Sequence, residues 1–128
     1  MEIGAKFKVT IKVEEKDTAI CHKSGTLAVL ATPRMIALME ESAYKCIEKY
    51  LDEGQSSVGT YLDVKHISAT PVGMEAYAES EVIEVDGRRV VFSLKAYDEK
   101  GLIGEGRHER FIVFSEKFVT KTYQKLDK

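Results

Sequence analysis

The stretch ALMEESAYKC, residues 37–46, decides the fold because it lies at the centre of the one long helix that the sequence predicts. In a helix each residue turns by about 100°, so Glu40 falls within roughly 60° of several apolar side chains. These are Ile36, Ala43, Tyr44, Ile47 and Leu51. Glu41 instead shares its side with polar residues, namely Arg34, Ser42, Lys45, Glu48, Lys49 and Asp52. Glu40 is therefore predicted to be a carboxylate on the apolar face, where a charge needs a partner.

The predicted helix begins in the segment ATPRM, residues 31–35, and ends near DEGQ, residues 52–55. Thr32 suits the N-cap, and Pro33 suits the first helical position, where its missing N–H has no cost. Gly54 is predicted to end the helix as a left-handed cap. Residues 15–31, which precede the helix, show no clear period and are predicted to form an irregular lead-in.

Alternation of apolar and polar residues predicts five strands around this helix. One strand covers residues 7–13 and precedes the helix, and four follow it at about 58–66, 74–82, 90–96 and 102–114. Turn signals separate the last four strands, including the Asp86–Gly87 pair expected in a tight hairpin. In the first strand after the helix, Val58, Leu62 and His66 are predicted to share the face that looks at the helix.

This order of elements indicates an α+β protein with a five-stranded antiparallel sheet wrapped around one long central helix. At 128 residues the chain is expected to be a single domain, residues 1–128. A hotdog fold and a cystatin-like fold both fit the order, and periodicity alone does not choose between them.

Composition excludes several classes of function. The formal charge of −2 provides no basic surface for nucleic acid. No run approaches the ~18 apolar residues of a membrane span, and the N-terminus lacks an apolar signal core, so a cytoplasmic protein is expected. Cys21 and Cys46 show no CxxC or Cys/His spacing, so neither a metal site nor a disulfide is expected.

His66 is the natural partner for Glu40, although an inward histidine is often only a satisfied core residue. Thr32 is expected at the helix start as a cap, but that end also offers N–H donors and a positive dipole to an oxyanion. Gly59 would let a substrate approach the strand backbone, or it marks a bulge.

The other histidines are weaker candidates for chemistry. His22 lies in the irregular lead-in, and His108 lies in a strand with charged residues on both faces. Among the arginines, Arg88, Arg89 and Arg107 are candidates for contact with phosphate groups, although arginines in turns and at sheet edges are more often solvated.

With these residues in place, the sequence resembles the hotdog thioesterases of the fluoroacetyl-CoA thioesterase-like family. The resemblance covers about residues 28–118 and rests on the segments VLATPRMIALMEESA, GTYLDVKHISATPVG, VDGRRVVFSLKAYD and IGEGRHERFIVFSEKF. It implies the hotdog fold. It also implies a set of site residues, with Thr32, Glu40 and His66 as catalytic groups and Gly59 and Arg110 as substrate-binding groups.

The resemblance further implies hydrolysis of an acyl-CoA thioester to free acid and CoA, in a homodimer with sites near the subunit interface. No cofactor is expected, because coenzyme A is part of the substrate. His66 would take a proton from Thr32 or from water, which leaves open whether Thr32 is acylated. Dimer and tetramer are both compatible with the sequence.

One departure from the family bears on the substrate. The fluoroacetyl-selective enzyme has a longer, phenylalanine-rich segment ahead of its catalytic threonine, whereas this chain has no phenylalanine between Phe7 and Phe92. A short-chain acyl-CoA other than fluoroacetyl-CoA is therefore expected. The alternatives are a non-catalytic acyl-CoA or small-molecule binding protein on the same scaffold, and an interaction protein with the cystatin-like layout.

Overall fold

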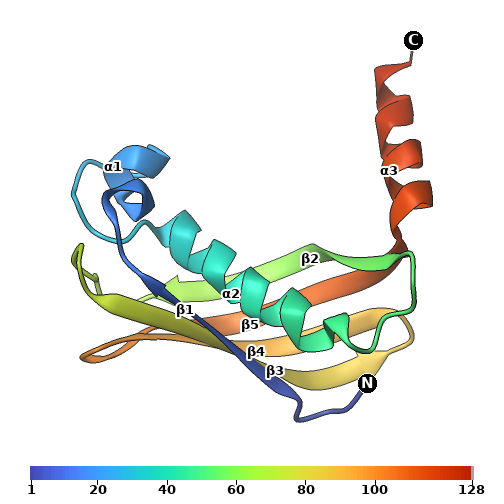
Figure 1. The fold of residues 1–128 in the computed structure, drawn as a ribbon, viewed down its shortest axis with the longest axis horizontal. Helices are drawn as coiled ribbons and strands as arrows, with labels where there is room; N and C mark the ends of the chain where they lie inside the picture. The colour runs from blue at the N-terminus through green and yellow to red at the C-terminus, as the bar shows by residue number, and fades with distance from the viewer. Residues whose placement is uncertain (128) are drawn as a thin grey trace.

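The computed structural model describes residues 1–127, and its strands form one antiparallel sheet in the order β1-β3-β4-β5-β2. The strands are β1 (Lys6–Lys12), β2 (Gln55–His66), β3 (Glu75–Asp86), β4 (Arg89–Asp98) and β5 (Gly101–Phe114). The helical elements are η1 (Glu15–Asp17), α1 (Ala19–His22), α2 (Thr32–Glu48), α3 (Ser115–Tyr123) and η2 (Gln124–Leu126). Figure 1 shows α2 lying across one face of the sheet, while α3 projects away from it. This arrangement confirms the predicted hotdog fold.

The core lies between α2 and the middle of the sheet. The helix buries one row of side chains, namely Met35, Leu38, Met39, Ser42, Ala43, Cys46 and Ile47. The facing sheet positions include Ala76 and Ala78 of β3, whose small side chains let the helix approach closely, and Phe92 of β4. The buried Ser42 hydroxyl donates to the Met39 carbonyl at 2.6 Å, so its burial leaves no polar group unpaired.

The buried row overlaps only in part with the apolar side that the sequence predicts: Ala43 and Ile47 are buried as expected, but the row is rotated away from Glu40 and Tyr44. Ser42, expected in solvent, is fully buried, whereas Tyr44, expected inside, is 39% exposed. The Glu40 side chain is 36% exposed and lies at the margin of the buried row rather than in its middle. The reason is that α2 has two apolar sides, and the sheet of one chain covers only one of them. The other side, defined here as the open flank of Ile36, Glu40 and Tyr44, is only partly covered.

Both predicted helix ends require correction. Ala31 is the N-cap, so Thr32 occupies the first helical position and its hydroxyl makes no capping bond. The helix ends at Glu48, and Gly54, with φ of 83°, lies in the turn that leads into β2. Residues 15–31 are irregular apart from the single turns η1 and α1, as expected.

A bulge in β2 decides which side chains face the helix. Gly59 pairs with Arg110, but Tyr61 pairs with Glu109, so Thr60 is an extra residue in β2. Such an insertion reverses the alternation of faces. Gly59 therefore lies on the same face as His66, and Val58 lies on the opposite face, contrary to the prediction. β2 is an edge strand, paired only with β5 in this chain. Within residues 1–127, no helix combines the length and apolar character needed to cross a bilayer.

Candidate active site

The start of α2 and the end of β2 bring a hydroxyl and an imidazole together. Thr32 Oγ1 lies 2.7 Å from His66 Nδ1, a hydrogen-bonding distance. Because Ala31 is the cap residue, the Thr32 hydroxyl is free to make this bond. The pair also lies at the positive end of the helix, where backbone N–H groups without helical partners favour negative charge.

A pocket of about 300 Å³ opens beside this pair. Its lining is made by Ala19, Ser24, Val29, Leu30, Ile67, Ser68 and Ala69, together with Thr32 and His66. Five of these nine side chains are apolar, and the other four carry hydroxyl or imidazole groups. The apolar part can pack against an aliphatic group attached to a carbon that the Thr32–His66 pair can reach.

Burial favours the neutral form of His66, which is the form that a general base needs. It lowers the pKa of His66 below its ordinary value of 6.5, so the imidazole is neutral at pH 7. A neutral ring that accepts the Thr32 proton at Nδ1 carries its own proton on Nε2. His66 Nε2 is buried and has no hydrogen-bond partner within residues 1–127.

Glu40 lies in a second cluster, further along the helix. Its Oε2 is 3.5 Å from Arg110 Nη1, and a Cβ atom added to Gly59 would lie 2.9 Å from the same oxygen. Glu40 is eight residues from Thr32, about 12 Å along the helix axis. The prediction that Glu40 pairs with His66 is therefore wrong for a single chain, because its partner there is Arg110.

Arg110 is buried and anchored to β2. Its Nε donates to Ser57 Oγ at 2.8 Å, and its Nη2 donates to the Ser57 carbonyl at 2.9 Å. On its other side, Nη1 lies 3.1 Å from His108 Nε2. The structure thus brings together Glu40, Gly59 and Arg110, which the sequence also singled out, and adds His108, which it did not.

His108 was underrated because charged neighbours hide the alternation of its strand. His108, Arg110 and Ile112 alternate on the buried face, while Arg107 and Glu109 point outward. Counting back by two from the apolar Ile112 would have identified the buried histidine.

The remaining candidate side chains are engaged elsewhere or exposed. Arg89 contacts Glu84 and Glu109, Arg107 contacts Glu109, and Arg88 lies over the Phe111 ring. His22 is exposed at the end of α1. The contact of these arginines with phosphate groups stays a prediction.

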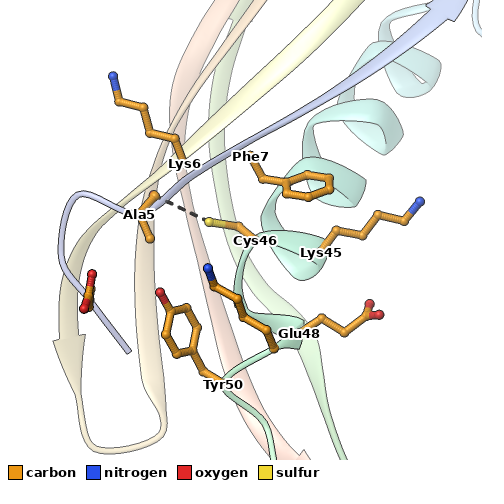
Figure 2. Close-up of a pocket in the computed structure, with 9 residues that line it drawn as sticks. Ala5, Lys6, Phe7, Lys45, Cys46, Glu48 and Tyr50 are labelled. Carbon is orange, nitrogen blue, oxygen red and sulfur yellow. Dashed lines mark hydrogen bonds between the residues drawn. The ribbon is translucent and has the colours of Figure 1, made fainter.

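A larger cavity, of about 590 Å³, lies between β1 and the end of α2 (Figure 2). Cys46 is the one cysteine among its lining residues. Burial raises the pKa of the Cys46 thiol, which disfavours the reactive thiolate. The thiol donates to the Ala5 carbonyl at 3.5 Å, and Lys45 is engaged by Glu41 at 2.7 Å. This cavity lacks a hydroxyl–imidazole pair, so the Thr32–His66 pocket is the better candidate for chemistry.

Comparison with known proteins identifies the family of this chain. The family model for fluoroacetyl-CoA-specific thioesterase matches residues 13–116. The fluoroacetyl-CoA thioesterase of Streptantibioticus cattleyicolor is 39% identical over 97 residues, which are 76% of this chain and 70% of that protein.

Solved structures give the same result. A structure of a fluoroacetyl-CoA thioesterase has a TM-score of 0.94 and 33% identity, covering 98% of this chain and 97% of the other. A threonine-to-serine variant of such an enzyme, in complex with acetyl-CoA, has a TM-score of 0.93 and 32% identity, covering 98% of both chains. The chain therefore belongs to the fluoroacetyl-CoA-specific thioesterase family.

Proposed function

We propose that this protein hydrolyses a short-chain acyl-CoA thioester to the free acid and CoA. The observation that carries this proposal is the 2.7 Å contact between Thr32 Oγ1 and His66 Nδ1 at the mouth of a small pocket. A thioester needs a nucleophile, a base and a group that stabilises the oxyanion. The first two are supported by this pair, and the third by the start of α2.

The neutral His66 would act first as a base. It takes the proton either from Thr32, whose oxygen then attacks the thioester carbonyl carbon, or from a water molecule that Thr32 positions. The tetrahedral intermediate then collapses, the carbon–sulfur bond breaks, and the imidazolium returns the proton to the CoA thiolate. In the first route, a water molecule subsequently hydrolyses the acyl-threonine. We favour direct attack by Thr32, because its hydroxyl contacts the base.

Glu40 would serve this site from a second protomer. Within one chain Glu40 contacts Arg110 rather than His66, and the helical spacing separates it from Thr32. In a two-fold symmetric dimer, Glu40 and Gly59 of one protomer can face the Thr32–His66 pair of its partner. Glu40 would then orient the attacking water or stabilise the imidazolium, while the Gly59 backbone lies close to the thioester.

Exposed apolar surface supports the dimer. The open flank of α2 includes Tyr44 at 39% exposure, and Leu62 on the helix-facing side of β2 is also 39% exposed. β2 additionally presents a free edge, which proteins commonly cover with another element or another chain. A second copy placed against β2 would cover both features and bring two sites to the interface.

The pocket and the sequence support a small acyl group. A pocket of about 300 Å³ has room for acetyl or propionyl beside the Thr32–His66 pair. We do not expect fluoroacetyl-CoA to be the preferred substrate, because no phenylalanine lies between Phe7 and Phe92 to form a fluorine-selective gate.

The test is thiol release from a panel of acyl-CoA esters, beginning with acetyl-CoA and propionyl-CoA. We expect the His66→Ala variant to lower kcat by at least about 100-fold, the usual contribution of a general base. A non-catalytic acyl-CoA-binding protein would instead bind these esters without turnover. Equal rates for the wild type and His66→Ala with every ester would refute hydrolysis at this site.

A further inference from the structure

His108 lies next to Glu40, Gly59 and Arg110, but it takes no part in the proton transfers and bond changes described above. It is completely buried, lies in β5 opposite Leu62, and stacks on the Phe92 ring at 6.0 Å between centroids. A Cβ atom added to Gly59 would lie 3.1 Å from His108 Cε1, so the imidazole packs directly against Gly59.

Two hydrogen bonds fix the proton on this imidazole. His108 Nδ1 lies 2.8 Å from the Tyr61 carbonyl, which can only accept, so the proton is on Nδ1. Burial lowers the pKa of His108, and the charge of Arg110 acts in the same direction, so the ring is neutral. Nε2 therefore presents a lone pair, and Arg110 Nη1 donates to it at 3.1 Å.

The guanidinium of Arg110 is thus held from two sides. Ser57 accepts from Nε and Nη2 on one side, and His108 accepts from Nη1 on the other. The remaining direction of Nη1 points at Glu40 Oε2, 3.5 Å away. Removing the lone pair at His108 would free the end of the guanidinium that faces the carboxylate, while the Ser57 end stayed anchored.

We propose that His108 is a positioning residue for the thioesterase site: its Nε2 lone pair aims Arg110 at Glu40 and so holds the carboxylate beside Gly59. This inference rests on the proposed function. It assigns to His108 an effect on turnover that passes through Arg110 and Glu40, without any contact between His108 and the substrate.

A purely structural role for His108 makes a different prediction. The bond from Nδ1 to Tyr61 joins β5 to β2 next to the bulge, and this bond alone could account for a buried histidine. Two substitutions separate these roles, because amide groups can replace either ring nitrogen. His108→Asn keeps a donor for Tyr61 but loses the acceptor for Arg110. His108→Gln keeps an acceptor near the position of Nε2 but loses the donor for Tyr61.

The experiment measures kcat, KM and thermal unfolding for the wild type and both variants in the thiol-release assay. If His108 aims Arg110, His108→Asn lowers kcat by up to about 100-fold with little change in KM, as expected for a misplaced site group. His108→Gln then recovers most of the lost kcat, even if its unfolding temperature is lower. If the role is only structural, stability and activity fall together, and His108→Gln is the worse variant.

Nitrogen-15 NMR of the wild type provides a second readout that does not depend on activity or on a folded variant. We expect His108 to show a protonated Nδ1 and an unprotonated Nε2 at neutral pH. A proton on Nε2, or a kcat that His108→Asn leaves unchanged, would overturn the inference. Absence of thiol release by the wild type would instead refute the proposed function, while the NMR spectrum would still decide whether His108 accepts from Arg110.

Discussion

Replacement of Gly59 by alanine tests whether Glu40 must lie where the structure places it. The added Cβ would lie 2.9 Å from Glu40 Oε2, whereas ordinary contacts lie at 3.4–4 Å. The carboxylate must therefore retreat by 0.5 Å (3.4 − 2.9) to 1.1 Å (4 − 2.9). The added Cβ would also lie 3.1 Å from His108 Cε1, so the buried imidazole must give by a few tenths of an ångström, while the flexible end of Glu40 makes the larger movement. Gly59 does not have a positive φ, so alanine fits its backbone conformation.

The expected magnitude follows from this displacement. A misplacement of about 1 Å costs up to about 100-fold in rate, so a shift of half that size should cost roughly tenfold in kcat. The stability should hardly fall, since a glycine-to-alanine change at a permitted conformation gains about 0.4–1 kcal/mol from the unfolded chain. We expect the Gly59→Ala unfolding temperature to stay within about 4 °C of the wild type.

The assay is steady-state thiol release combined with thermal unfolding monitored by circular dichroism. The matched control repeats Gly59→Ala in a Glu40→Ala background, where there is no carboxylate to displace. Residues that act together give non-additive effects, so Gly59→Ala should cost much less kcat there, where only its contact with His108 Cε1 remains. An equal loss of kcat in both backgrounds, or a loss of activity that follows a loss of stability, would refute the reasoning.

Three further predictions follow from the site and its surroundings. Thr32→Val should lower kcat by roughly 100-fold because it removes the hydroxyl that contacts His66, whereas Thr32→Ser should retain most of the activity. Similar rates for the two variants would contradict a role for the hydroxyl. The pH profile of kcat/KM should have its acid limb below 6.5, because burial lowers the pKa of His66 and activity needs the neutral ring. The neutral ring is lost as the pH falls through this lowered pKa, so an acid limb above 6.5 would contradict the buried environment of His66. Arg34→Ala should cost about 1–3 kcal/mol in chemical denaturation, because it leaves the buried Asp17 carboxylate without the ion pair that Arg34 makes at 2.9 Å; a change below 0.5 kcal/mol would show that water replaces the arginine.

Much of the architecture could be predicted from periodicity. The strands and the long helix each bury one face, so their alternation survives in the sequence, and the turns carry glycine where positive φ is needed. The side of α2 that meets the sheet could not be predicted in this way. Both the row around Met39 and the open flank around Tyr44 are apolar, and only the packed sheet decides between them.

The sequence singled out most of the residues that the structure brings together, but it missed His108 and did not predict how they group. Thr32 and His66 meet as expected, yet Glu40 pairs with Arg110, because eight helical residues separate it from Thr32. The bulge at Thr60 moves Gly59 to the inner face, and alternation cannot reveal an inserted residue. Neither can alternation reveal which residues of two chains would meet at the proposed shared site.

The most direct measurement mixes two impaired variants, His66→Ala and Glu40→Ala, under conditions that let protomers exchange, and then follows thiol release from acetyl-CoA or propionyl-CoA. If Glu40 serves the Thr32–His66 pair of its partner, each mixed dimer holds one intact site, and the mixture should recover about a quarter of the wild-type rate at random exchange. A mixture no more active than either variant alone, with exchange confirmed by mass, would contradict a site shared between protomers.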